Sequence, residues 1–211
     1  MSEIQYGLIS RTDANVLEKT IDLICDEFAP NNLMNVTEIG LFDCGTAMGI
    51  KEYVYSKQWL IYYTGIDSEK DKPINAPFWL HYIKGNSNEV YNQIEDNSQH
   101  LIFVDGCHCF AHVISDFFCY APKVKVGGYL AFHDTGVHIK PFKDFQHGDK
   151  NNPDAYISVR KALQTIGLLE PFLNPKYQNV EGGIYDQWEL IFDEADETNE
   201  AGGICVFKKL Y

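Results

Sequence analysis

The amino-acid sequence predicts an α/β fold with a mostly parallel, seven-stranded sheet and helices on both of its faces. Apolar runs of strand length alternate along the chain with segments whose apolar residues recur every three or four positions, as in a helix. The last two apolar runs are separated only by an acidic turn, which is typical of an antiparallel hairpin. We therefore expect parallel strands first and a hairpin at the C-terminal end.

The N-terminal half begins with a predicted helix over residues 13–28, capped by Thr12 or Asp13. Glycines break the first apolar run, and this pattern indicates a strand, a tight turn and a second helix that ends near Lys57. Further helices are expected to start at Ser87 and Phe110. The five expected parallel strands are residues 36–42, 59–67, 78–85, 101–106 and 127–134.

The C-terminal part begins with a polar segment over residues 135–151, which has no period and is expected to be a loop. Asn152, Pro153 and an acidic residue then form a helix start signal, so a helix is expected to about Gly167. The hairpin strands are expected at 188–194 and 203–209.

Composition restricts the class of function. Of the 211 residues, 45% are hydrophobic and 22% are charged, as in an ordinary globular domain. A formal charge of −13 disfavours binding to nucleic acid or to anionic membranes. The sequence shows no signal peptide and no apolar run of membrane-spanning length, and its six cysteines form no CxxC pair. A cytoplasmic location is therefore expected.

Polar residues stand where several predicted strands end. Asp67 ends the second strand, Asp105 follows the apolar run of the fourth, and His133 and Asp134 end the fifth. The carboxyl ends of parallel strands share one edge of the sheet, where ligands bind in such folds. We expect these side chains to lie together at that edge.

The first three strand ends have features of a nucleoside site. Gly40 and Gly45 let the chain turn tightly, whereas GxGxxG and GxxxxGK[ST] are both missing. Asp67 is placed to accept both hydroxyls of a ribose. Asn86 and Ser87 are placed either to meet an adenine edge or, for Ser87, simply to cap a helix.

The last two strand ends have features of a cation site. Asp105 and Asp134 would repel one another unless a cation or a proton separates them. Oxygen ligands with one imidazole suit magnesium, manganese or calcium. His108 and His133 are candidate ligands or general bases. Asp116, four positions after a histidine on the next helix, either forms an exposed pair with it or holds the preceding loop in place.

These segments resemble a known family. The ordered set EIGLFDCGT, YYTGIDSE, IKGNSNEV, FVDGCHCFAHVISD and GGYLAFHDT is similar to the class I S-adenosylmethionine-dependent methyltransferases, and more narrowly to their small-molecule and sugar O-methyltransferase branch. In that branch a DGxHxY…D segment precedes GGxxxxHD. The resemblance covers roughly residues 33–136 and implies a Rossmann-like class I methyltransferase fold. It implies one domain with four parts: a helical segment (1–32), a cofactor-binding core (33–136), a lid or acceptor loop (137–152) and a C-terminal helix with the hairpin (153–211).

The resemblance also implies residue roles. S-adenosylmethionine would be bound by Glu38, Gly40, Gly45, Asp67, Asn86, Ser87 and Asp105. Asp105, His133 and Asp134 would hold Mg²⁺ or another divalent cation, and the catalytic residues would be His108, Asp105 and His133. Two cysteines depart from the family pattern: Cys44 stands where glycine is common, and Cys107 stands where many relatives carry an aspartate that acts as base. His108 is the natural substitute for that base.

The implied activity is O-methylation of a small molecule or a sugar, assisted by a divalent metal, in a protein that forms a homodimer. One alternative is a metal-dependent, hydroxylase-like enzyme on the same fold. A second is a non-catalytic module that keeps the cofactor pocket, which Cys44 and Cys107 would favour. A third, a nicotinamide-dependent oxidoreductase, is disfavoured by the missing GxGxxG.

Overall fold

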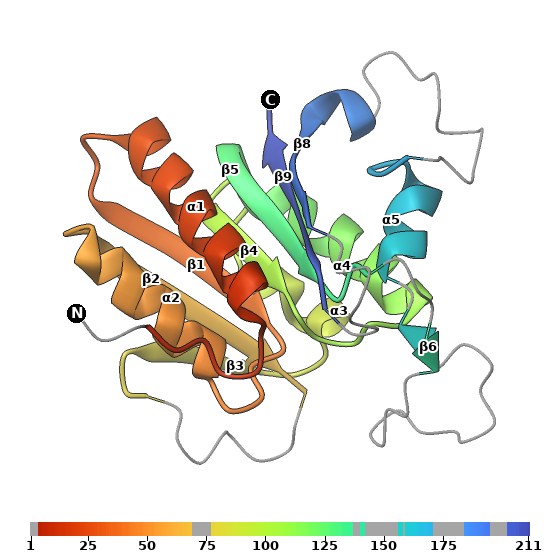
Figure 1. The fold of residues 1–211 in the computed structure, drawn as a ribbon, viewed down its shortest axis with the longest axis horizontal. Coiled ribbons are helices and arrows are strands. Elements are labelled where there is room, and N and C mark those ends of the chain that lie inside the picture. The colour runs from red at the N-terminus through yellow and green to blue at the C-terminus, as the bar shows by residue number, and fades with distance from the viewer. Residues whose placement is uncertain are drawn as a thin grey trace.

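The computed structural model describes residues 4–68, 77–136, 140–141, 156–157, 159–170, 184–194 and 202–211. Its centre is a seven-stranded sheet in the order β3-β2-β1-β4-β5-β9-β8 (Figure 1). Strands β1 to β5 pair in parallel, and β9 runs antiparallel to both β5 and β8. The predicted parallel sheet and the C-terminal hairpin are thus confirmed. The strands of this sheet are β1 (Leu33–Ile39), β2 (Leu60–Asp67), β3 (Leu80–Lys84), β4 (Gln99–Val104), β5 (Val124–His133), β8 (Trp188–Glu194) and β9 (Ile204–Lys209).

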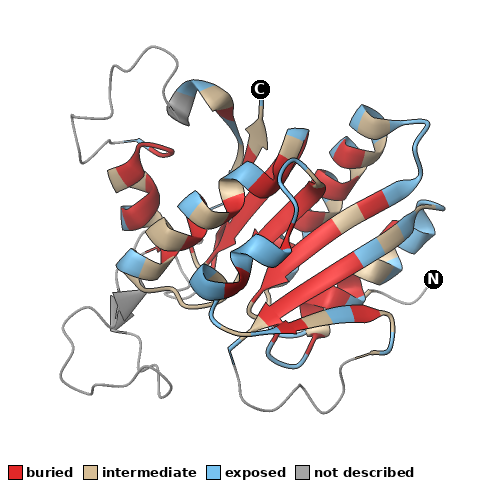
Figure 2. Cartoon of the chain, turned by 180° about the vertical axis from the view of Figure 1, so that it is seen from behind, coloured by how far each residue is buried: buried red, intermediate tan, exposed pale blue. Residues whose placement is uncertain are grey.

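Helices cover both faces of the sheet. On one face, α1 and α2 pack over an apolar core that includes Leu17, Ile50 and Phe103. On the other face, α3, α4 and α5 share a second core that includes Phe117 and Leu163. Seen from behind, the central strands are buried between these layers (Figure 2). The helices are α1 (Arg11–Phe28), α2 (Gly45–Ser56), α3 (Ser87–Val90), α4 (Phe110–Tyr120) and α5 (Val159–Ile166), with 3₁₀ turns η1 (Tyr91–Gln93), η2 (Ala121–Lys123) and η4 (Ile184–Gln187).

Helix α1 begins two residues earlier than its predicted start. Its N-cap is Ser10, whose Oγ accepts a hydrogen bond of 3.1 Å from the backbone N–H of Asp13. The predicted caps, Thr12 and Asp13, both lie within the first turn. The prediction was wrong because Ser10 and Asp13 are both good capping residues, and only the structure shows which of them stands outside the helix.

Two further boundaries were also predicted wrongly. Strand β1 ends at Ile39 rather than at residue 42, because Gly40 adopts φ +86° and turns the chain out of the extended conformation. Helix α5 begins at Val159. Before it, β7 (Tyr156–Ile157) lies where a helix was expected, and it pairs with β6 (Lys140–Pro141), which lies in the expected loop. The expected start signal at 152–154 lies outside the described residues.

The exits of β1 and β4 lie in direct backbone contact. Gly40 donates a hydrogen bond to Ile66 O at 2.9 Å, and Asp105 donates one to Ile39 O at 2.8 Å. A Cβ atom added at Gly40 would lie 2.3 Å from the carbonyl oxygen of Asp105 and 2.7 Å from the Cα of Gly106. Only glycine allows this approach, which fixes where Asp105 leaves the sheet.

Among the helices of the described residues, none combines the length and the apolar character that a membrane crossing requires.

Candidate active site

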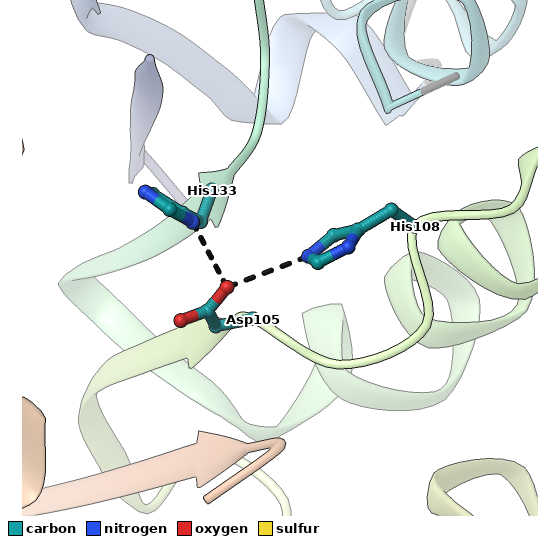
Figure 3. Close-up of side chains that lie close together, drawn as sticks. All are labelled: Asp105, His108 and His133. Atoms are coloured by element: carbon teal, nitrogen blue, oxygen red, sulfur yellow. Dashed lines mark hydrogen bonds and ion pairs between the residues drawn. The ribbon is translucent and has the colours of Figure 1, made fainter. Parts of the chain in front are cut away.

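Four predicted residues gather beyond the carboxyl ends of β4 and β5. Nδ1 of His133, the last residue of β5, lies 2.9 Å from Asp105 Oδ1. Nε2 of His108 lies 3.4 Å from the same oxygen, so both rings point at one carboxylate (Figure 3). Asp134 completes the group, with Oδ2 3.3 Å from His108 Nδ1 and Oδ1 3.6 Å from His133 Nδ1.

The turn after β5 brings Asp134 back toward the other three residues. Asp134 has φ +54°, a left-handed conformation that aspartate tolerates better than most residues. The side chains of Asp105, His108 and Asp134 keep 19%, 13% and 12% of their surface exposed, so the group is mostly buried.

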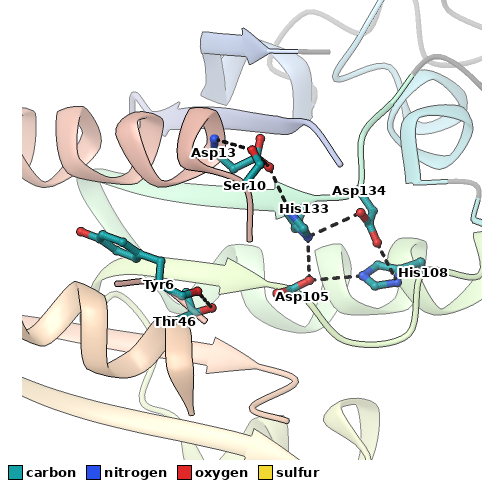
Figure 4. Close-up of polar contacts among 8 residues, drawn as sticks. All are labelled: Tyr6, Ser10, Asp13, Thr46, Asp105, His108, His133 and Asp134. Atoms are coloured by element: carbon teal, nitrogen blue, oxygen red, sulfur yellow. Dashed lines mark hydrogen bonds and ion pairs between the residues drawn. The ribbon is translucent and has the colours of Figure 1, made fainter. Parts of the chain in front are cut away.

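A fifth polar residue, Asp13, reaches the group from α1 (Figure 4). Its Oδ2 lies 3.3 Å from Nε2 of His133 and also accepts a 2.7 Å hydrogen bond from Ser10 Oγ. Asp13 is only 2% exposed. The sequence suggested Asp13 only as a helix cap, and its spacing of 120 residues from His133 left no local pattern to reveal the contact.

Opposite charges dominate the protonation of this group. Burial by itself would raise the pKa of Asp105, but the charges and hydrogen bonds of His133 and His108 outweigh it and lower this pKa to about 2. Burial likewise opposes the imidazolium form of His133, yet Asp105 and Asp13 hold its pKa well above the usual value. For Asp13 too, burial is outweighed by His133 and Ser10, and its pKa is lowered. The protein therefore places a cationic ring between two carboxylates.

The donors also fit a divalent cation. Asp105, His108 and His133 each offer one ligand atom, and these atoms lie within 4.8 Å of one another. Carboxylate oxygen and imidazole nitrogen are both common ligands of divalent metals. A cation bound at Nδ1 of His133 would replace the proton on that nitrogen and would offset the same carboxylate charges.

Asp67 stands at the end of β2, as predicted, and holds the loop that follows β1. Its Oδ2 accepts hydrogen bonds from the backbone N–H groups of Leu41 at 2.9 Å and Phe42 at 3.3 Å. Phe42 is 71% exposed and has φ +43°, which is uncommon for an aromatic residue. The carboxylate is therefore tied to the loop where the nucleoside site was predicted.

The same loop explains one departure from the family pattern. Cys44 adopts φ +65°, a conformation that glycine reaches without strain, so a glycine in related sequences would suit this position. The next residue, Gly45, lies against the N-terminal segment, because an added Cβ would stand 2.4 Å from the Cα of Gly7. Gly7 was not singled out from the sequence, since an isolated glycine near a chain end has no pattern.

Glu38 lies deeper in the sheet than the other candidates. It is 1% exposed, and its Oε2 accepts a 2.6 Å hydrogen bond from the hydroxyl of Tyr63 on the neighbouring strand. Burial raises its pKa well above the usual value, although the bond from Tyr63 opposes this effect and the charge of Asp105 adds to it. Glu38 is therefore held inside the sheet by Tyr63, a partner that the sequence did not predict.

Asn86 and Ser87 follow β3 and stand at the start of α3. Asn86 occupies the N-cap position without a side-chain capping bond, so the predicted cap at Ser87 was wrong. The Ser87 hydroxyl instead donates a 2.5 Å hydrogen bond to Asp116 of α4. Asp116 is 2% exposed, which rules out an exposed pair on that helix, and burial raises its pKa to about 7 against the opposing bond from Ser87.

The raised pKa of Asp116 predicts a pH-dependent effect on stability. Its folded pKa of about 7 lies above its ordinary value of 3.8, so the wild type loses stability as the pH rises through this interval. We expect Asp116→Asn to gain stability relative to the wild type by on the order of 2–4 kcal/mol between pH 4 and pH 8. Urea unfolding at both pH values measures this, with Asp26→Asn, an exposed site, as the control. A difference independent of pH would contradict the prediction.

Comparison with known proteins agrees with this architecture. Residues 61–135 match a family model described as a methyltransferase domain. TomG, an O-methyltransferase of Streptomyces achromogenes solved with SAM, has a TM-score of 0.62 at 11% identity, over 96% of this chain and 82% of that chain. The Bacillus cereus O-methyltransferase solved with SAH has a TM-score of 0.59 at 12% identity, over 95% and 82% of the two chains.

A third similar structure contains a metal. The MycE methyltransferase of the mycinamycin biosynthetic pathway, in complex with Mg, SAH and mycinamycin VI, has a TM-score of 0.56 at 16% identity. This match covers 97% of our chain and 50% of MycE, so the chain spans about half of that protein. Curated protein sequences gave no match.

The similar structures establish the fold of this chain. It is the fold of the class I S-adenosylmethionine-dependent methyltransferases, as the sequence segments predicted. Within it, residues 61–135 are the part that matches the methyltransferase-domain model.

Proposed function

We propose that this protein is an S-adenosylmethionine-dependent O-methyltransferase that acts on a small molecule or a sugar with the help of a divalent cation. The single observation that carries the proposal is the meeting of Asp105, His108 and His133 at the carboxyl-end edge of a methyltransferase fold. The ligands of the similar structures support the same proposal, because SAM, SAH, Mg and mycinamycin VI are named with them.

The proposed cofactor site lies around the loop after β1. Asp67 is assigned to the ribose, and Gly40 and Gly45 to the methionine end, with Glu38 supporting the loop from the core. Asn86 and Ser87 are assigned to the adenine. Asp105 would lie beside the sulfonium, because it leaves the sheet against Gly40.

The proposed reaction is an in-line displacement. The acceptor oxygen forms a bond to the methyl carbon, the carbon–sulfur bond breaks, and the thioether of S-adenosylhomocysteine leaves. His108 takes the proton of the acceptor hydroxyl, and Asp134, 3.3 Å from its Nδ1, orients the ring. Asp105, His133 and Asp134 would hold the divalent ion, which when bound would lower the pKa of an acceptor hydroxyl and fix its direction. The chain itself aligns the reacting groups and shields them from water.

The remaining predictions belong to the same proposal. Residues 137–152 are assigned to a lid or acceptor loop, within one domain that spans residues 1–211. A cytoplasmic location is supported by the six cysteines, all described, none of which is joined in a disulfide. A homodimer remains a prediction from the resemblance.

A second candidate function is a metal-dependent hydroxylase on the same fold. The observation that favours it is the donor composition, because two histidines with one carboxylate are typical of iron-dependent oxygenases. Mass spectrometry of acceptors incubated with the metal-loaded protein separates the two functions. A product heavier by a methyl group, formed only with S-adenosylmethionine, supports the proposed function. The gain of one oxygen atom from O₂, with the second oxygen atom reduced to water by an added two-electron reductant, supports the alternative.

Binding of the spent cofactor gives the first test. We expect calorimetry to show S-adenosylhomocysteine binding to the wild type and at least roughly tenfold weaker binding to Asp67→Ala, because the ribose hydroxyls lose a charged acceptor worth about 1.5–3 kcal/mol. Asp96→Ala is the matched control, since Asp96 is an exposed partner of Lys123. Equal affinities of the wild type and Asp67→Ala would contradict the assignment of the cofactor pocket.

A further inference from the structure

We propose that Asp13 is a positioning residue for the cation site: it holds Nε2–H of His133, so that Nδ1 of the same ring faces Asp105. This inference rests on the divalent cation of the proposed function. It assigns a role to the first turn of α1, which lies outside every segment of the family resemblance.

The two nitrogens of His133 have different partners. Nδ1 lies 2.9 Å from Asp105 Oδ1 and 3.6 Å from Asp134 Oδ1. Nε2 lies 3.3 Å from Oδ2 of Asp13, which reaches the ring from α1 (Figure 4). A carboxylate can only accept, so in the metal-free protein each of the two nitrogens donates to a carboxylate. Nε2 keeps its hydrogen toward Asp13, and Nδ1, which faces Asp105 and Asp134, is the nitrogen that would exchange its hydrogen for a metal.

Asp13 is itself held in place. The Ser10 hydroxyl donates to Asp13 Oδ2 at 2.7 Å, and the Ser10 Oγ accepts from the backbone N–H of Asp13 at 3.1 Å. A capping role alone does not require burial, because an N-cap works equally well in water. With 2% exposure, the Asp13 carboxylate needs a buried partner, and His133 is that partner.

The arrangement matches a general rule of metal sites. A histidine that binds a metal through one nitrogen usually donates its other N–H to a carboxylate, which fixes the tautomer and the orientation of the ring. Loss of such an outer partner typically lowers metal affinity by about 10–100-fold. The same loss is therefore expected for Asp13→Asn, which keeps the size of the side chain and removes its charge.

The test measures Mn²⁺ binding by electron paramagnetic resonance on the full chain, freed of metal with a chelator. We expect Asp13→Asn to weaken Mn²⁺ binding by about 10–100-fold. Asp22→Asn is the matched control: it removes the same charge from the same helix, where Asp22 contacts Tyr53 and Lys57, and should change the affinity less than about twofold. Equal losses of Mn²⁺ affinity in both variants would mean that any negative charge on α1 has the same effect through long-range electrostatics. That result would overturn the proposal.

A double-mutant cycle shows whether Asp13 acts through His133. If it does, Asp13→Asn should have no further effect on Mn²⁺ affinity in a His133→Asn background. Additive losses would overturn the proposal. Should Asp13→Asn fail to fold, as judged by circular dichroism, Ser10→Ala serves in its place, because it removes the hydroxyl that holds Asp13 Oδ2. It should show a smaller loss in the same direction.

Binding of S-adenosylhomocysteine distinguishes a failure of the role proposed for Asp13 from a failure of the proposed methyltransferase function. Asp13→Asn should bind it as the wild type does, because Asp13 contacts only His133 and Ser10 among the polar partners described above. If the wild type binds S-adenosylhomocysteine but its Mn²⁺ affinity does not respond to Asp13→Asn, only this inference fails. If the wild type does not bind S-adenosylhomocysteine, the proposed function fails.

Discussion

Asp105→Asn is expected to reduce methyl transfer by at least roughly 100-fold. A single oxygen of Asp105, Oδ1, lies 2.9 Å from His133 Nδ1 and 3.4 Å from His108 Nε2. The amide keeps the shape of the side chain and removes the charge that orients the two rings and that would face the cation and the sulfonium. One substitution thus weakens every proposed function of the site at once.

The loss in Asp105→Asn can be measured as S-adenosylhomocysteine formed in the presence of a panel of phenols and sugars. Asp96→Asn, at an exposed carboxylate that pairs with the buried Lys123, is the control and should keep wild-type turnover. Circular dichroism establishes that both variants are folded. Turnover of Asp105→Asn within about threefold of the wild type would show that the chemistry takes place elsewhere.

Gly40→Ala is expected to lower the free energy of unfolding by about 3 kcal/mol or more and to abolish cofactor binding. The new methyl group would stand 2.3 Å from the carbonyl oxygen of Asp105, at a backbone φ of +86° that L-residues avoid. Neither obstacle can be relieved by a side-chain rotation, because both involve the backbone. The exits of β1 and β4 would have to separate, and Asp105 would move with them.

Gly106→Ala provides the comparison, because it adds the same methyl group on the other side of this contact. There the nearest atom is the side-chain Cγ2 of Ile39 at 3.3 Å, so we expect a loss of about 1 kcal/mol or less. Urea unfolding gives both values, and calorimetry with S-adenosylhomocysteine gives the cofactor affinity. Similar losses in the two variants would mean that the close approach at Gly40 is not what holds the site together.

Sequence patterns predicted the sheet and its carboxyl-end edge well, because both follow from local periodicity and from the geometry of parallel strands. Once the apolar runs were placed, Asp67, Asp105 and His133 had to emerge at the same edge. The meeting of His108 with Asp105 also follows, since His108 lies only three positions further along the chain. These contacts need no knowledge of how distant segments pack.

The contacts that the sequence did not predict are those that depend on packing between layers. Asp13 looked like a helix cap because an aspartate can either cap a helix or hold a metal-binding histidine. Only the docking of α1 on the sheet, which brings Asp13 to His133, shows which of the two roles applies. Asp116 looked exposed because its burial depends on where Ser87 lies after a different strand. The start of α5 was misjudged because β6 and β7 pair with one another, a contact that competes with local helix signals.

The bond between Asp13 and His133 joins positions 120 residues apart. During synthesis, the first turn of α1 leaves the ribosome long before β5 exists, so the centre cannot form until residue 133 has been added. Its geometry requires the N-terminal helix to be docked beside β5. Metal uptake by this chain would therefore serve as a probe of finished tertiary structure, which spectroscopic helix content cannot provide.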